Sequence, residues 1–94
     1  MRLDLFLKHS RLVPRRSVAQ EMCDAGAVAV NGQPGKPGRD VKVGDTLVIR
    51  ARGRQTTARV ARVPARAPSK ADAPSLSELI AVESYDTDTL YRER

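Results

Sequence analysis

The side chains with the clearest chemical potential in this sequence are cations near two predicted helix ends. Lys8, Arg11, Arg15 and Arg16 fall at the end of one predicted helix, in the link that follows and in the first turn of the next. Two helices joined in this way would bring the four cations to one end of the pair. Guanidinium groups match phosphate oxygens in charge and geometry. The pattern therefore favours a nucleic-acid partner.

The position of two of these arginines supports this interpretation. Arg15 and Arg16 stand at a predicted helix N-terminus, where the helix dipole disfavours positive charge. Such an unfavourable placement of charge is expected where a residue serves binding at a cost in stability. The alternative is that both side chains extend into solvent, or pair with Glu21, Asp24 or the acidic C-terminal residues.

Catalytic chemistry finds little support in the sequence. It has no Ser-His-Asp order, no phosphate-cradling glycine loop and no carboxylate pair at a spacing typical of acid/base work. His9 is the single histidine, and a polar contact on a basic surface is its favoured role. Cys23 is the single cysteine and is predicted to be a buried small hydrophobe. We expect no catalytic residue, no metal site and no cofactor.

The charge of the chain is divided unevenly along its length. The 94 residues carry 17 Lys+Arg and 11 Asp+Glu, a net charge of +6, and 13 of the 17 cations are Arg. Residues 1–66 hold 14 cations and 5 carboxylates, whereas residues 67–94 hold 3 and 6. A basic body followed by an acidic tail again fits a nucleic-acid partner. No apolar run approaches the roughly 20 residues of a membrane span, and the charged N-terminus does not resemble a secretory signal, so we expect a cytoplasmic protein without a membrane partner.

The sequence divides into three segments. Residues 1–63 hold most of the branched aliphatic side chains and form the expected folded domain. Residues 64–75 are dominated by Pro and Ala and are predicted to be a linker. Residues 76–94 form the acidic tail. Leu76, Leu79 and Ile80 recur there at helical spacing after a potential Ser75 cap, which predicts a short helix.

The domain itself has the pattern of an α+β unit. Apolar residues at helical spacing predict a helix of about two turns over 3–8 and a second from about Arg15 to before Gly26. Val28 to Val30 alternates as a strand, and Asn31-Gly32 is a strong hairpin signal. Residues 33–40 are predicted to be a loop or irregular edge. Further strands are expected over 46–50 and 56–63.

The order of short motifs resembles the S-four RNA-binding domain family over residues 2 to about 50. The motifs are Arg2-Leu3-Asp4, Phe6-Leu7-Lys8, Ser10-Arg11-Leu12, Arg15-Arg16-Ser17, Ala19-Gln20, Asp24-Ala25-Gly26, Val28, Val30-Asn31-Gly32 and Val43-Gly44-Asp45. The chain is most similar to the free-standing, ribosome-associated members of that family, both the type that serves bacterial ribosome quality control and the heat-shock type. The resemblance implies an alpha-L-type fold, with two short helices packed on a small, mostly antiparallel sheet.

The resemblance also implies roles for individual residues. The positions that match RNA-facing cations of the family are Arg2, Lys8, Arg11, Arg15 and Arg16. Asp4 matches an acidic residue that organises the first helix. Lys36, Arg39 and Lys42 would extend the RNA footprint. The chain departs from the family at Leu5, where a cation is usual, and at Pro14, which several relatives lack.

The function implied by the resemblance is binding without catalysis. Such proteins bind large ribosomal subunits obstructed by peptidyl-tRNA, contact ribosomal RNA and tRNA, and assist a partner that tails the stalled chain. A monomer is expected away from the ribosome. The alternatives are a module for free tRNA or another structured RNA, and a protein-interaction adaptor acting through an acidic tail that holds Tyr85 and Tyr91. An RNA-modifying enzyme is disfavoured because such enzymes carry a large catalytic domain beside this module.

Overall fold

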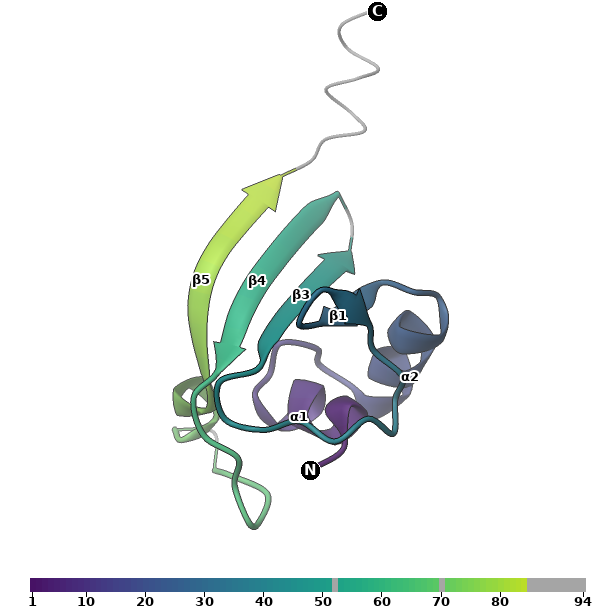
Figure 1. The fold of residues 1–94 in the computed structure, drawn as a ribbon. Coiled ribbons are helices and arrows are strands. Elements are labelled where there is room, and N and C mark those ends of the chain that lie inside the picture. The colour runs from purple at the N-terminus through teal and green to yellow at the C-terminus, as the bar shows by residue number, and fades with distance from the viewer. Residues whose placement is uncertain (52, 70, 85–94) are drawn as a thin grey trace, which may run out of the picture.

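Two helices lie against one five-stranded sheet (Figure 1) in the computed structural model, which describes residues 1–51, 53–69 and 71–84. The elements in chain order are α1 (Leu3–His9), α2 (Arg16–Asp24), β1 (Val28–Val30), β2 (Gln33–Pro34), β3 (Thr46–Ala51), β4 (Arg54–Val60), the 3-10 turn η1 (Ala73–Leu76) and β5 (Ser77–Ser84). The strand order is β2-β1-β3-β4-β5, and every pairing is antiparallel. The predicted α+β fold with two short helices is confirmed.

The helices supply one half of the core. In α1, Leu3, Phe6 and Leu7 are all fully buried, as their i, i+3, i+4 spacing predicts. In α2, Ala19 and Cys23 face the core. Burial, with the nearby Asp4 and Asp24 carboxylates, raises the pKa of the Cys23 thiol to about 11. The thiol is therefore protonated near neutral pH, and the prediction of a buried small hydrophobe is confirmed.

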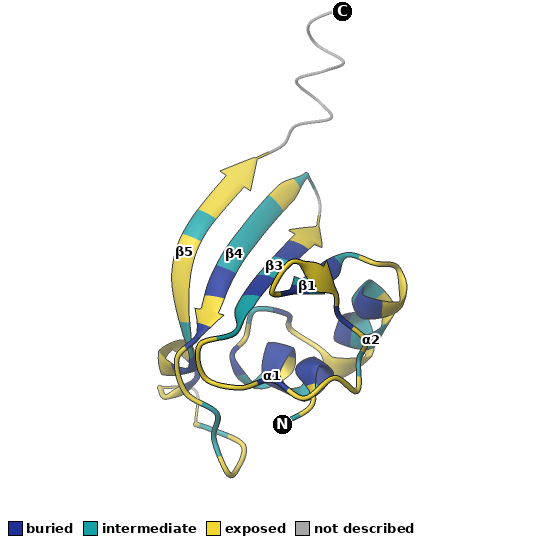
Figure 2. Cartoon of the chain, viewed as in Figure 1, coloured by how far each residue is buried: buried dark blue, intermediate teal, exposed yellow. Residues whose placement is uncertain are grey.

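The sheet supplies the other half (Figure 2). Val28 and Val30 of β1, Leu47 and Ile49 of β3, and Val60 of β4 belong to the same buried cluster as the helix residues. Alternate residues on each strand point to one face, so α1 and α2 cover the part of this face to which these residues belong. The helix end that carries the predicted cations is thereby fixed relative to the sheet.

The first hairpin forms where the sequence predicts it. Asn31 has a φ of 52° and Gly32 a φ of 83°, the left-handed pair that a tight two-residue turn between twisted strands requires. The Asn31 side chain also accepts a hydrogen bond from the Thr46 N–H at 2.9 Å and donates one to Asp45 at 3.1 Å. The turn therefore links β1 to the start of β3.

The expected helix after Ser75 is wrong, because residues 77–84 form β5 at the edge of the sheet. The Ser75 hydroxyl donates to the Asp72 carbonyl instead of capping a helix. Leu76 is fully buried, and its carbonyl accepts from the N–H groups of Ala61 and Arg62 at 2.8 and 3.1 Å. Pairing with β4 satisfies the backbone of this segment, which a marginal isolated helix would leave to water. The first part of the predicted acidic tail thus completes the sheet, while the rest, residues 85–94, falls outside the described residues.

Gly35 is required by close packing. A Cβ atom there would lie 2.7 Å from Leu3 Cδ2 and 3.1 Å from Val30 Cγ2, and both side chains are fully buried. We expect Gly35→Ala to lower the free energy of unfolding by about 1 to 3 kcal/mol, the usual cost of overpacking a core. Urea unfolding followed by circular dichroism checks this. Gly38→Ala is the control, since its Cβ would approach nothing closer than 3.9 Å, and equal stability losses in the two variants would contradict the packing argument.

Two features of the described residues bear on function. None of their helices is long and apolar enough to cross a membrane. The same residues contain no group of three or more His, Cys, Asp or Glu side chains placed to hold a metal ion.

Candidate nucleic-acid interface

Asp4 is a buried carboxylate at the centre of the candidate site. Its side chain is fully inaccessible to solvent, yet it accepts five hydrogen bonds. Arg2 donates two of them, from Nε to Oδ1 at 3.2 Å and from Nη2 to Oδ2 at 3.3 Å. Arg16 Nε and Gln20 Nε2 donate to Oδ2 at 3.3 and 2.9 Å, and the Leu5 N–H donates to Oδ1 at 2.8 Å. One carboxylate therefore joins the start of α1 to the first turns of α2.

These contacts keep Asp4 ionised. Burial by itself would raise the pKa of this carboxyl, but the hydrogen bonds from Gln20, Arg2, Arg16 and the Leu5 N–H outweigh it and hold the pKa below its ordinary value. A charged group buried in this way is normally paired, as it is here. The carboxylate therefore keeps its negative charge and its hydrogen bonds to both arginines at neutral pH.

The side chains of Arg2 and Arg16 each contact Asp4 but remain partly exposed to solvent. Their side chains are 50% and 42% exposed, although both contact a group that is 0% exposed. A guanidinium fixed in this manner loses less conformational freedom on binding a ligand than a free one. The alternative pairing of Arg16 with Glu21 or Asp24 is not found among the described residues, where its carboxylate partner is Asp4.

The end of α1 adds further positive charge next to Arg16. The Arg11 N–H donates to the Lys8 carbonyl at 3.0 Å, and Arg11 adopts a φ of 62°, so the chain turns sharply there. Burial, together with the charges of Lys8 and Arg16, lowers the pKa of His9. Lys8 and Arg16 therefore act on the same imidazole, and His9 is largely neutral near pH 7.

The loop after β2 packs beside Arg2. The N–H groups of Leu3 and Asp4 donate to the Arg39 and Pro37 carbonyls at 2.7 and 3.1 Å. Lys36 and Arg39 are exposed and line a shallow pocket of about 520 Å³. The structure thus brings the loop cations to the same region as the Asp4 cluster.

Two predicted site residues make contacts other than with the Asp4 cluster. Arg15 lines a different pocket, between α2 and the sheet. Lys42 is exposed, and its N–H donates to Asp45 at 2.9 Å. No side-chain contact of the described residues ties either cation to Asp4.

Gln20 belongs to the Asp4 cluster, although it was not among the site residues predicted from the sequence. It lies four residues after Arg16, so both side chains project from the same side of α2. The four-residue spacing of Arg16 and Gln20, together with an acidic residue in α1, was the sequence signal that could have predicted this contact. The start of α2 is also suited to an anion, because its first turn carries no acidic residue and its N-cap, Arg15, makes no side-chain capping bond.

The pH dependence of stability should report on Asp4. Because its folded pKa is depressed, its contribution is complete above the unfolded value of about 3.9 and is lost as the pH falls through the lower folded value. We expect the difference in unfolding free energy between wild type and Asp4→Asn to be largest near neutral pH and to shrink below about pH 4. Urea unfolding over a pH series checks this, and a constant difference would mean that the carboxylate charge is not what stabilises the site.

Comparisons with known proteins identify relatives of this chain. A family model described as S4 domain matches residues 1–47. A "RQC P-site tRNA stabilizing factor" from Listeria monocytogenes is 45% identical over 86 residues, covering 92% of each chain. A protein of the same name from Bacillus subtilis is 52% identical over 50 residues, covering 53% of this chain and 58% of its own. The solved structure of Heat Shock Protein 15 from Vibrio cholerae, described as trimeric, has a TM-score of 0.78 and 28% identity, and covers 100% of this chain and 90% of that one.

Proposed function

This chain belongs to the S4 domain family, and we propose that it is an RNA-binding protein that stabilises tRNA at the P site in ribosome quality control. Its binding partner is the large ribosomal subunit obstructed by peptidyl-tRNA, and it contacts both ribosomal RNA and tRNA there. The protein works by binding alone and takes no chemical step. The relatives with high coverage support this role through their name.

The observation that carries the proposal is the pair of arginines fixed by the buried Asp4 carboxylate. An α+β domain of this size recognises structured RNA mainly by shape and by phosphate contacts. Arg2 and Arg16 present such contacts at a fixed separation, because both are tied to Asp4. A rigid pair of this kind matches a rigid RNA surface.

We propose that the remaining predicted cations form the outer part of the footprint. Lys8 and Arg11 extend it along the end of α1, and Lys36 and Arg39 extend it over the loop beside Arg2. Arg15 and Lys42 contact RNA only at the margins of this footprint, because Arg15 lines a different pocket and the Lys42 backbone is bonded to Asp45. We further propose that the protein is a cytoplasmic monomer away from the ribosome and that it works beside a factor that tails the stalled chain.

Cross-linking followed by RNA sequencing tests the proposed partner. We expect the cross-links to concentrate in large-subunit ribosomal RNA and tRNA. Sites spread evenly over cellular RNA would contradict the ribosomal assignment. Cross-links to tRNA alone would instead support the alternative of a module for free tRNA.

The affinity should depend steeply on salt. If about five cations neutralise phosphates, log K plotted against log salt should have a slope of about −3.5 to −4.5, through counterion release. Fluorescence anisotropy with labelled protein and large subunits over a KCl series measures this. A slope near zero would mean that phosphate contacts do not drive binding.

A further inference from the structure

One edge of the sheet is formed by β5, a strand with exposed aliphatic side chains. β5 pairs with β4 along one side, and no strand of the described residues pairs with its outer side. The strand is largely exposed along its length (Figure 2). Its sequence, SELIAVES, contains neither Lys nor Pro, the residues that commonly protect a strand edge from pairing with another chain. The outer side of β5 is therefore suited to an additional strand.

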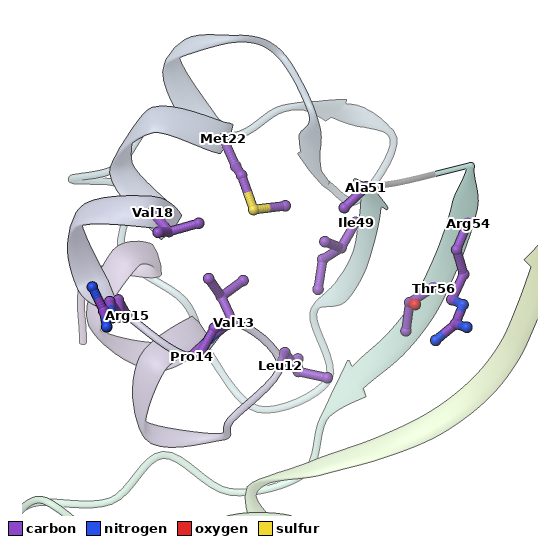
Figure 3. Close-up of a pocket in the computed structure, with 10 residues that line it drawn as sticks. All are labelled: Leu12, Val13, Pro14, Arg15, Val18, Met22, Ile49, Ala51, Arg54 and Thr56. Carbon is purple, nitrogen blue, oxygen red and sulfur yellow. The ribbon is translucent and has the colours of Figure 1, made fainter.

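The rows of paired side chains on the helix side of the sheet end on β5. Directly paired residues of neighbouring strands share one face of a sheet. One row consists of Val30, Leu47, Ala58 and Leu79, and the next of Val28, Ile49, Thr56 and Val82. Ile49 and Thr56 both line the pocket between α2 and the sheet (Figure 3), which places this row on the helix side. Both rows begin in the core, whereas Leu79 and Val82 are 60% and 48% exposed, so an apolar strand beside β5 would continue both rows.

The far face of β5, which points away from the helices, is acidic. Glu78 is paired with Arg59 and Glu83 with Gln55, and both glutamates are exposed. Gln55 accepts a hydrogen bond from Arg50 of β3 at 3.0 Å. Each far-face row therefore has an arginine in the sheet and ends in a carboxylate at the edge. Because opposite charges on neighbouring strands stabilise a sheet, the next position outward favours a cation in both rows.

The charge of this edge disfavours a second copy of the chain as its occupant. Two β5 strands paired edge to edge would bring together two carboxylates from each copy and no cation of either strand. Like charges on neighbouring strands are destabilising. The same carboxylates disfavour RNA, because its phosphates are also negative. The favoured occupant is a protein segment with apolar residues on one face and cations on the other.

We propose that β5 accepts, as an added edge strand, an extended segment of a partner protein in which apolar residues alternate with Lys or Arg. Main-chain hydrogen bonds to the outer side of β5 hold the segment, and its side chains give the specificity. Its apolar side chains lie beside Leu79 and Val82, and its cations lie beside Glu78 and Glu83. β5 is at the opposite edge of the sheet from β2 (Figure 1), so this docking does not rest on the proposed function.

Two capped, fluorescently labelled peptides test the proposal with the full chain. One alternates Val with Lys, and the other alternates Val with Glu. The chain has a net charge of +6, so its overall charge favours the Glu peptide, whereas β5 favours the Lys peptide. We expect anisotropy titrations to show that the Lys peptide binds about tenfold tighter or more. Tighter binding of the Glu peptide, or no saturable binding of the Lys peptide up to about 1 mM, would overturn the proposal.

Charge reversal on β5 checks the position of the bound peptide. The Glu78→Lys, Glu83→Lys double variant should reverse the preference and bind the Glu peptide more tightly. The matched control is Glu21→Lys, Asp24→Lys, which changes the net charge equally at two exposed positions of α2 and should keep the preference for the Lys peptide. The same response in both double variants would contradict the assignment to β5.

A measurement on the unmodified chain keeps the test independent of any effect of the variants on folding. Addition of the Lys peptide should change the amide chemical shifts of residues 77–84 and leave those of the Asp4 cluster unchanged. Shift changes that leave out residues 77–84 would overturn the proposal. A wild-type dimer in sedimentation equilibrium that the Lys peptide dissociates would also overturn it, because β5 would then pair with a second copy.

Discussion

Replacing Arg2 and Arg16 together with alanine is expected to weaken binding to obstructed large subunits by about 100-fold or more. A hydrogen bond to a charged group contributes about 1.5 to 3 kcal/mol, and about 1.4 kcal/mol corresponds to a tenfold change in Kd. Each arginine alone should therefore cost about tenfold, if each makes one such bond to RNA. The loss should be largest at low salt, where phosphate contacts contribute most.

The arginine experiment needs a control for charge and one for folding. Arg50→Ala removes the same type of side chain from the far face of the sheet, so it should leave the affinity nearly unchanged. Circular dichroism should show that the double variant is folded at the assay temperature. Retained binding in the folded double variant, or an equal loss in Arg50→Ala, would show that RNA does not contact the Asp4 cluster.

Asp4→Asn is expected to lower the free energy of unfolding by about 2 kcal/mol, since it turns a charge-assisted cluster into a neutral one. It should also weaken RNA binding several-fold, because an amide cannot accept from Arg2, Arg16 and Gln20 at once, and the arginines lose their fixed positions. Urea unfolding and anisotropy titration with large subunits measure the two effects separately.

The direction of the change in RNA affinity shows whether Asp4 acts by positioning the arginines or only through its charge. Asp4→Asn makes the protein more positive, so charge alone predicts tighter RNA binding. Asp40→Asn changes the net charge equally, but Asp40 is 66% exposed and pairs with the N-terminal amine. We expect unchanged or slightly tighter binding from Asp40→Asn and weaker binding from Asp4→Asn. Tighter binding in both variants would mean that Asp4 does not position the arginines.

The helices, the first hairpin and the buried thiol could be predicted from sequence because each depends on local information. A buried helix face is predicted by the spacing of Leu3, Phe6 and Leu7. A tight turn is predicted by Asn31-Gly32, because both residues readily adopt the left-handed backbone conformation that is found there. β5 could not be predicted in this way. Its pairing partner, β4, is distant in sequence, and the tertiary hydrogen bonds override the helical spacing of Leu76, Leu79 and Ile80.

The candidate site was only partly predictable for a similar reason. The sequence groups Arg15 with Arg16, but Arg15 is the N-cap of α2 and has an extended backbone, whereas Arg16 is the first residue of the helix. The Arg16 side chain accordingly reaches Asp4, and Arg15 lines the pocket between α2 and the sheet. The resemblance placed Asp4 at the start of the first helix, yet its link to α2 through Arg16 and Gln20 depends on how the two helices pack.

The most direct measurement of the central claim is co-sedimentation of the purified full chain with large ribosomal subunits of two kinds. One sample carries peptidyl-tRNA at the P site and the other is empty. We predict that the protein co-sediments preferentially with the obstructed subunits, and that the Arg2→Ala, Arg16→Ala double variant loses this preference while Arg50→Ala keeps it. Equal binding to both kinds of subunit, or to neither, would contradict the account.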